Sequence, residues 1–214
     1  MTTDPILTLT QWLSPAFPVG AFTYSHGLEV LVDAGTVCDA ASFEAWLTDT
    51  IQHGAGQNDV ILLAHAYKAD TVEALTEIDT FARALAPSAE RLLETDQQGA
   101  AFARTAAAIH DLNLSTLTYP VAVGRAARLQ DLPLHDTARL FLHAFAANLT
   151  SAATRLVPLG QTEAQATIAA VIPLCQEVAD QAVTLSLDDI AASTFASDIA
   201  SMRHETQYSR LFRS

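Results

Sequence analysis

Apolar residues recur at intervals of three and four along most of the chain, which is the spacing of a helix with one buried face. The clearest example is a late segment with apolar side chains at Ala164, Ile168, Val171, Cys175, Val178 and Ala182. No segment shows a sustained alternation of apolar and polar residues, the pattern expected of a half-buried strand. The pattern therefore predicts an all-α protein.

Proline, glycine and capping residues divide this pattern into separate helices. We expect helices at residues 6–13, 21–34, 39–53, 58–68, 71–85, 87–110, 120–130, 135–157 and 164–182. Gly35 should close the second helix, Asp39 or Ser42 should cap the third, and Gly54 and Gly56 should mark its end. Pro173 removes one backbone hydrogen bond and predicts a kink in the last of them. The whole is a single-domain bundle of roughly eight to ten helices over residues 1–202, followed by a short C-terminal segment, residues 203–214.

The segment 135–157 differs from the others because apolar side chains occupy nearly all of its faces. They are Leu140, Phe141, Leu142, Ala144, Phe145, Ala146, Ala147 and Leu149. A helix that is apolar all round is buried on all sides. We therefore expect this helix at the centre of the bundle, with Phe145 in the core.

The chain is strongly acidic, with 24 aspartates and glutamates against 11 lysines and arginines and a formal net charge of −13. Such a charge repels phosphate groups, which argues against nucleic acid and anionic membranes as partners. The N-terminus lacks the basic and apolar regions of a secretory signal, and no apolar run is long enough to span a membrane. A cytoplasmic location is the expectation.

Catalytic motifs are incomplete wherever the sequence begins one. Ser25 lies in Thr23–Gly27, which lacks the first glycine of a nucleophile elbow. His204 and Glu205 begin a zinc-binding helix, but Tyr208 stands where the second histidine belongs. The sequence contains no P-loop motif. We expect no catalytic residue and no cofactor held by this chain alone.

A metal site within one chain is also not expected. His135, Arg139 and His143 share one helical stripe, but the two imidazoles are too far apart along the axis to bind one ion. Cys38 and Cys175 belong to no C-x-x-C pair and are expected to be small buried apolar residues.

The C-terminal segment has a charge of opposite sign to the rest of the chain. It carries three arginines and one glutamate, so it is cationic while the remaining residues carry all of the net negative charge. Tyr208, Leu211 and Phe212 would form one apolar face if the segment were helical. Two alternatives are open: the segment docks on a partner, or it folds back on its own acidic body.

The approach to this segment poses a geometric problem. Ile199 and Tyr208 are nine residues apart, which places them on opposite sides of a continuous helix. Either the helix breaks between Met202 and Gln207, or its two faces serve two surfaces.

Three stretches of the chain resemble the signatures of one protein family. They are LSPAFPVGAFTYSHGLE at residues 13–29, RLVPLGQ at residues 155–161 followed by Gln165, and SMRHETQYSRLFRS at residues 201–214. All three are similar to motifs of the UreF family of urease accessory proteins. They lie near both ends and in the middle of the chain, in the family's order.

This resemblance implies an all-helical, non-catalytic scaffold of urease maturation. Members of the family form homodimers, bind UreD (also called UreH) and recruit the GTPase UreG, and the complex acts on apo-urease. Nickel is the cargo of this complex and is thought to pass through an internal passage that crosses the UreF and UreD subunits.

The resemblance also assigns roles to residues of this chain. The partner-binding residues would be Arg203, His204, Glu205, Gln207, Tyr208, Arg210, Leu211 and Phe212, with Arg210 matching the arginine associated with UreG recruitment. Arg155, Gln161 and Gln165 would belong to the dimer interface and the passage. The alternative is a regulator of GTP hydrolysis by UreG, in which Arg210 or Arg155 acts as an arginine finger.

Overall fold

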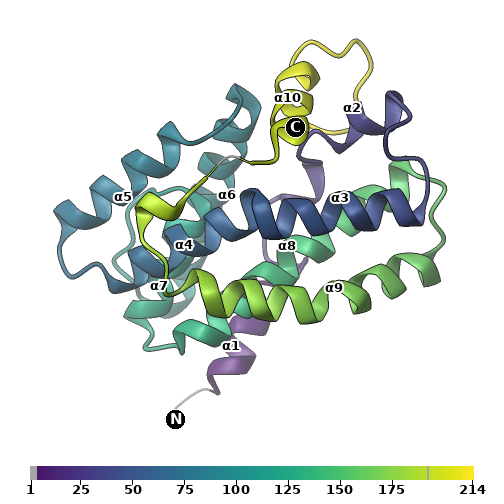
Figure 1. Cartoon of the computed structure of the whole chain (residues 1–214). Helices are drawn as coiled ribbons and strands as arrows, with labels where there is room; N and C mark the ends of the chain where they lie inside the picture. The colour runs from purple at the N-terminus through teal and green to yellow at the C-terminus, as the bar shows by residue number, and fades with distance from the viewer. Residues whose placement is uncertain (1–3, 192) are drawn as a thin grey trace.

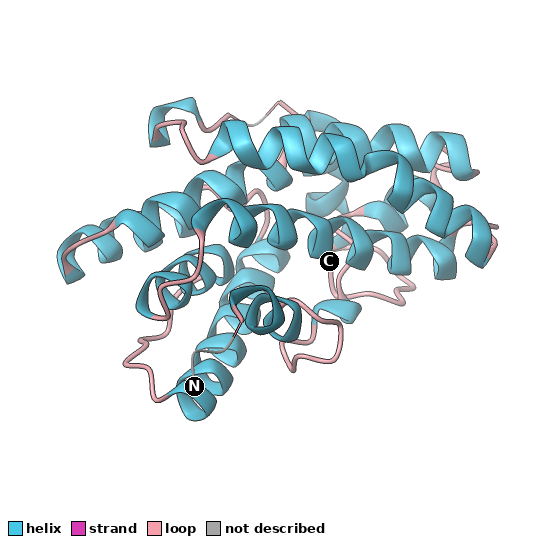
Figure 2. Ribbon diagram, turned by 90° about the horizontal axis from the view of Figure 1, so that it is seen from below, coloured by secondary structure: helices cyan, strands magenta, loops and turns pink. Residues whose placement is uncertain are grey.

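The computed structural model describes residues 4–191 and 193–214, and its regular structure in these ranges is entirely helical (Figure 2). The α-helices are α1 (Pro5–Trp12), α2 (Leu28–Asp33), α3 (Ala40–His53), α4 (Ala55–Lys68), α5 (Val72–Ala84), α6 (Ala89–His110), α7 (Tyr119–Leu129), α8 (Leu134–Leu156), α9 (Gln161–Ala182) and α10 (Phe195–His204). Two 3-10 turns, η1 (Ala21–Thr23) and η2 (Leu187–Asp189), complete the set. The predicted all-α fold is confirmed.

The bundle is organised around α4 and α8. Helix α4 packs most extensively on α7, and α8 packs on α9 while also meeting α3, α4 and α7. Figure 1 shows α3, α4 and α9 crossing the molecule, with α1 at one end and α10 beside α2 at the other. The contact of α10 with α2 and α6 brings the C-terminal segment against an early part of the chain.

Two helical glycines permit the closest helix contacts. A Cβ on Gly124 of α7 would lie 2.2 Å from the carbonyl oxygen of Leu63 on α4. A Cβ on Gly99 of α6 would lie 2.0 Å from the carbonyl oxygen of Leu117, just before α7. Any side chain at either position would force the neighbouring backbone away, so these glycines set the spacing of α4, α6 and α7.

The predicted helix at residues 21–34 is wrong in its middle. The chain forms η1, leaves the helical conformation at Tyr24 and resumes it only in α2. His26 and Gly27 adopt positive φ angles of 57° and 76°. A Cβ on Gly27 would lie 2.6 Å from the backbone nitrogen of Ser201, so this break allows α10 to approach the start of α2.

Other helix boundaries differ less from expectation. Asp39 forms a capping box with Ser42, and Gly35 has a φ of 71° after α2, both as predicted. Helix α4 begins at Ala55, so Gly56 lies inside it rather than in a linker. Pro87 precedes the true N-cap of α6, which is Ser88.

Helix α8 is central, as predicted, but Phe145 is not in its core. Leu142 and Leu149 are fully buried, whereas Phe145 is half-buried. Its ring instead lies edge-on to the imidazole of His26 and lines a cavity described below. The apolar pattern placed the helix correctly but could not show that one of its faces borders a cavity.

In the part of the chain that the structure describes, none of the helices has the length and apolar character needed to cross a membrane.

Candidate functional site

The C-terminal segment folds back on the body of the protein. Helix α10 ends at His204, so of the two alternatives raised by the sequence, a helix break between Met202 and Gln207 is the one observed. The residues that follow are not helical, and the apolar face proposed for a helical segment does not form. The segment runs past α2 and the start of α6 and ends beside Ser25, whose backbone amide donates to the carbonyl oxygen of Ser214 at 2.7 Å.

A buried carboxylate on α2 organises this return. Glu29 accepts hydrogen bonds from the backbone amides of Leu211 at 2.7 Å and Phe212 at 3.0 Å. Its Oε2 also lies 3.2 Å from the Nε2 of His204. His204 is fully buried, and its Nδ1 lies 2.6 Å from the carboxylate of Glu90 on α6. One imidazole thus joins two carboxylates from separate helices at the base of the segment.

Phe212 anchors the segment through its side chain. Its ring is 4% exposed, and the guanidinium carbon of Arg155 on α8 lies 5.3 Å from the ring centroid. The same guanidinium donates to the carbonyl oxygen of Phe22 at 3.1 Å. Residues from all three motifs therefore meet here: Phe22 and Glu29 from the first, Arg155 from the second and Phe212 from the third.

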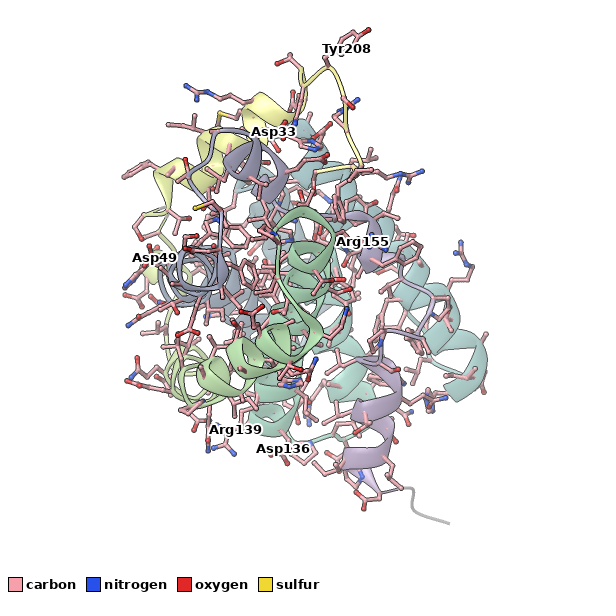
Figure 3. The ribbon with its side chains drawn as sticks, turned by 90° about the vertical axis from the view of Figure 1, so that its right-hand side faces the viewer. Asp33, Asp49, Asp136, Arg139, Arg155 and Tyr208 are labelled. Carbon is pink, nitrogen blue, oxygen red and sulfur yellow. The ribbon has the colours of Figure 1, made fainter. Side chains whose placement is uncertain are left out.

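Two large apolar side chains of the segment are left in solvent. Tyr208 is fully exposed and Leu211 is 74% exposed. Figure 3 shows Tyr208 at the tip of the C-terminal loop, pointing away from the body, with Asp33 beneath the loop. The segment is therefore held by Phe212 and presents Tyr208 and Leu211 outward.

The polar residues of the segment divide into anchored and exposed groups. Arg210 pairs with Glu90 at 2.5 Å, and the Oε1 of Glu205 accepts from the backbone amide of Ala89 at 2.7 Å. Gln207 donates to Asp33. Arg203 is exposed at the end of α10. Folding back on the acidic body, one of the two alternatives raised by the sequence, is thus observed, but it leaves a surface on which a partner can still dock.

Gln161 and Gln165 lie apart from this cluster. Both are exposed on the first turns of α9, where Gln161 is the first helical residue after Gly160. Their spacing of four residues places both amides on one face of the helix. The structure therefore groups Arg155 with the C-terminal segment rather than with the two glutamines.

A buried network that the sequence analysis missed lies next to the segment. Glu94 of α6 accepts from Gln98 at 2.9 Å and from the hydroxyl of Ser214 at 2.8 Å, and it pairs with Arg91 one helical turn away. Arg91 also approaches the Nε2 of His26 at 2.5 Å. The same nitrogen lies 3.1 Å from the Oε1 of Glu94, so His26, Arg91 and Glu94 are in direct contact with one another.

Burial and charge fix the protonation of this network. Burial, reinforced by the positive charge of Arg91, lowers the pKa of His26. Burial alone would raise the pKa of Glu94, but the Arg91 guanidinium and the His26 contact outweigh it and lower that pKa to about 2. At neutral pH the network therefore contains one anion, one cation and one neutral imidazole.

Two cavities of about 350 Å³ each meet at this network. The first lies among the loop after α1, α6 and α8, and Phe17, Phe145 and Asn148 contribute to its lining. The second lies among α4, the start of α6 and α10, and its lining includes Asn58 and Ile199. Five residues line both cavities and form a shared wall: His26, Asp59, Arg91, Thr95 and Pro120.

Asp59 is the second carboxylate at this wall. It is half-buried on α4, and burial raises its pKa to about 7, with Arg91 opposing the shift and Glu94 adding to it. Arg91 forms its ion pair with Glu94. The carboxylate of Asp59 has no direct ion pair or hydrogen bond with another described residue, and Arg91 affects it only through its charge. The sequence gave no signal that Asp59 of α4 and Arg91 of α6 would lie close together, because their proximity depends on how the helices pack.

The sequence-derived metal and catalytic candidates are placed in separate environments. His135 and Arg139 both bond Asp180 of α9, whereas His143 lines the first cavity. Figure 3 shows Arg139 beside Asp136 at the end of the molecule opposite Tyr208. Among the described residues, no group of three or more histidine, cysteine or acidic side chains is arranged to hold a metal ion.

The serine and cysteine side chains considered as possible nucleophiles or metal ligands are Ser25, Cys38 and Cys175. Ser25 is fully buried, and its hydroxyl donates to the carbonyl oxygen of Ser214. Cys175 is buried as predicted, and burial raises the pKa of its thiol to about 11. Cys38 is exposed, so the prediction that it is a buried apolar residue is wrong; it lies in the turn before α3.

Comparison with known proteins gives one consistent result. A family model described as UreF matches residues 37–172. "Urease accessory protein UreF" of Roseobacter denitrificans is 56% identical over 214 residues, which is 100% of this chain and 96% of that protein. The proteins of that name from Ruegeria pomeroyi and Rhodopseudomonas palustris are 53% and 50% identical. They cover 100% and 96% of this chain, and 98% and 90% of their own lengths.

Proposed function

The chain belongs to the UreF family of urease accessory proteins, and we propose that it acts in urease maturation as a non-catalytic scaffold. In this proposal it forms a homodimer, binds UreD and recruits the GTPase UreG, and the assembly delivers nickel to apo-urease. The relatives named above, which match the chain over nearly its full length, support the role in maturation. The particular partners are proposed from the motifs and their positions.

The observation that carries the proposal is the convergence of the three motifs on Phe212. Glu29 and Arg155 hold this residue and its backbone, and in doing so they fix the loop that carries Tyr208. An exposed aromatic side chain on a firmly anchored loop loses little conformational entropy on binding, which favours a docking role. We propose that Tyr208 and Leu211 contact UreD and that Arg210, beside them, contributes to UreG capture.

Gln161 and Gln165 support the proposed dimer. Exposed amides one turn apart can pair with the same amides of a second copy across a two-fold axis, because each amide both donates and accepts. Their position on α9, away from the C-terminal segment, leaves that segment free for other partners.

The two cavities support a route for nickel inside the protein. They adjoin at the shared wall, and their common lining includes a histidine and an aspartate, side chains that can contact a divalent ion. We propose that nickel, the cargo of the complex, moves through these cavities without a permanent site in this chain.

The alternative, in which this chain supplies an arginine finger to UreG, has less support. An arginine finger must extend to the nucleotide of another protein. Arg210 is paired with Glu90, and Arg155 is held by Phe22 and the ring of Phe212. Both guanidiniums would first have to leave these contacts.

Size-exclusion chromatography with light scattering tests the scaffold proposal. The wild-type chain is measured alone, then with UreD, then with UreD and UreG; a dimer that gains each partner in turn is expected. Arg210→Ala should retain UreD and lose UreG, while Arg104→Ala, an exposed arginine of α6, should behave as wild type. A monomer that binds neither protein would overturn the proposal. Steady-state GTP hydrolysis by UreG is also measured with and without this chain. An unchanged rate would support the scaffold proposal over the regulator alternative.

A further inference from the structure

The shared wall between the two cavities contains titratable groups from three parts of the chain. His26 comes from the turn before α2, Asp59 from α4 and Arg91 from α6, and Glu94, the ion-pair partner of Arg91, lines the first cavity only. An ion moving from one cavity to the other would therefore pass these side chains.

Asp59 is the one carboxylate among the five residues that line both cavities. Arg91 and Glu94 neutralise each other through a direct ion pair, and burial together with the positive charge of Arg91 lowers the pKa of His26, which keeps the imidazole neutral at neutral pH. Asp59 adds one negative charge when ionised and none when protonated. The other titratable groups that line one or both cavities are Tyr119, His143 and Asp198. Burial, reinforced by the charge of Asp59, raises the pKa of Tyr119, which keeps it neutral. His143 lines the first cavity only, and Asp198 lines the second only, where burial raises its pKa and the charge of Arg91 opposes that shift.

We propose that Asp59 is an electrostatic gate that controls the passage of a divalent cation between the two cavities. With Asp59 ionised, the shared wall is anionic and attracts the ion across it; with Asp59 protonated, the wall is neutral and no longer attracts the ion. This inference rests on the proposed function, because it assigns a control point to the nickel route.

The charge of Asp59 acts strongly on an ion at the cavity wall. Low-dielectric cavity walls screen an ion less than water does, so one carboxylate changes the local concentration of a divalent cation by about tenfold or more. Burial raises the pKa of Asp59 to about 7, so the gate would change state near neutral pH. Removing the charge of Asp59 should therefore slow the passage of the cation above pH 7 and have almost no effect on it below pH 6.

The test compares Asp59→Asn with wild type in urease activation reconstituted from purified accessory proteins, apo-urease and Ni²⁺. Asparagine keeps the shape of the side chain and removes its charge. The matched control is Asp49→Asn, an exposed aspartate on α3 that Figure 3 shows at the edge of the molecule. Dividing each rate by the wild-type rate at the same pH cancels the pH dependence of the other components.

The expected ratio for Asp59→Asn is close to one at pH 6 and about one tenth at pH 8. Asp49→Asn should give a ratio of one throughout, and Asp59→Glu should recover most of the rate at pH 8. A ratio for Asp59→Asn that is independent of pH overturns the gate. A structural defect would instead appear as weaker capture of UreD and UreG by size-exclusion chromatography at every pH.

A second measurement on the chain alone separates this inference from the proposed function. Paramagnetic Ni²⁺ should broaden the NMR signal of the Thr95 methyl group, which lines both cavities. The broadening should be stronger at pH 8 than at pH 6, and Asp59→Asn should remove that difference. If wild-type protein does not support urease activation, the proposed function fails whatever the NMR result. If activation is normal but Ni²⁺ broadens Thr95 equally in Asp59→Asn, only the gate fails.

Discussion

The carboxylate of Glu29 accepts a hydrogen bond from the backbone amide of Phe212 at 3.0 Å, although 183 residues separate the two along the chain. The contact is buried, and the same carboxylate also accepts from Leu211. Hydrogen bonds to a buried charged acceptor are stronger than those between neutral groups. Glu29 therefore helps to fix the position of the C-terminal segment.

Glu29→Gln should release the C-terminal segment while leaving the helical bundle folded. A neutral amide replaces the charged acceptor, so each backbone bond is weakened by about 1 kcal/mol or more. Trypsin should then cut the Arg210–Leu211 bond at least about tenfold faster, because the amide of Leu211 is no longer held. Glu44→Gln, on the exposed face of α3, is the matched control and should be cut as slowly as wild type. Equal cutting of all three proteins would show that Phe212 alone holds the segment.

Tyr208→Ala should weaken the binding of UreD without changing the stability of this chain. The side chain is fully exposed, and surface substitutions of this kind alter the free energy of unfolding by about 0.5 kcal/mol or less. Loss of an aromatic side chain from the centre of an interface costs about 2 kcal/mol or more in binding. Urea unfolding and calorimetric titration with UreD would measure the two effects. Unchanged affinity for UreD would remove Tyr208 from the proposed interface.

The helical periodicity of the sequence was sufficient to predict the fold because most of the helices have one apolar face that must be buried. The same periodicity failed at residues 24–27, where local pattern continues to favour helix. There the backbone is fixed by a distant contact instead: Gly27 must lie against the backbone of Ser201. A tertiary contact between the two ends of the chain decides this turn, and nothing in the segment itself signals it.

The candidate site was only partly predictable, because the contacts that assemble it also join distant parts of the chain. The C-terminal segment stood out by its charge, and Arg155 and Glu29 lie in quoted motifs, but their meeting at Phe212 requires the folded chain. Asp59 and Arg91 lie in no motif. Their importance comes from lining two cavities at once, which depends on the packing of α4 against its neighbours.

Leu142→Asp and Phe145→Asp should have very different effects although they lie one turn apart on α8. Leu142 is fully buried, so an aspartate there leaves a charge without a partner in the core and should abolish folding. Phe145 is half-buried at the first cavity, where water can reach a new carboxylate. Phe145→Asp should therefore give folded protein with a reduced melting temperature. Circular dichroism of the two variants checks this, and equal loss of helix would place both residues in the core.

Glu94→Gln should lower the stability of the protein at neutral pH but not at strongly acidic pH. Arg91 and its other partners lower the pKa of Glu94 from 4.5 to about 2, so the folded state binds fewer protons than the unfolded state between these values. The stabilisation is complete above pH 4.5 and is lost as the pH falls towards 2, with a size of about 3 kcal/mol. Urea unfolding at pH 7 and pH 3 should show a larger difference from wild type at pH 7. A difference that is constant with pH would mean that Glu94 acts through packing alone.

Asp59→Asn should have the opposite effect on stability, because the pKa of Asp59 is shifted in the opposite direction. Burial raises it from 3.8 to about 7, so the folded state binds more protons than the unfolded state between these values. The ionised carboxylate therefore destabilises the fold progressively as the pH rises from about 4 to about 7, and the cost is constant above that range. Asp59→Asn removes this cost and should be more stable than wild type at pH 8 but not at pH 4. Asp49→Asn, whose side chain is exposed, should show no such gain. Urea unfolding of the three proteins at both pH values is the measurement, and an Asp59→Asn variant that is less stable at pH 8 would mean that the carboxylate has a partner that stabilises its charge.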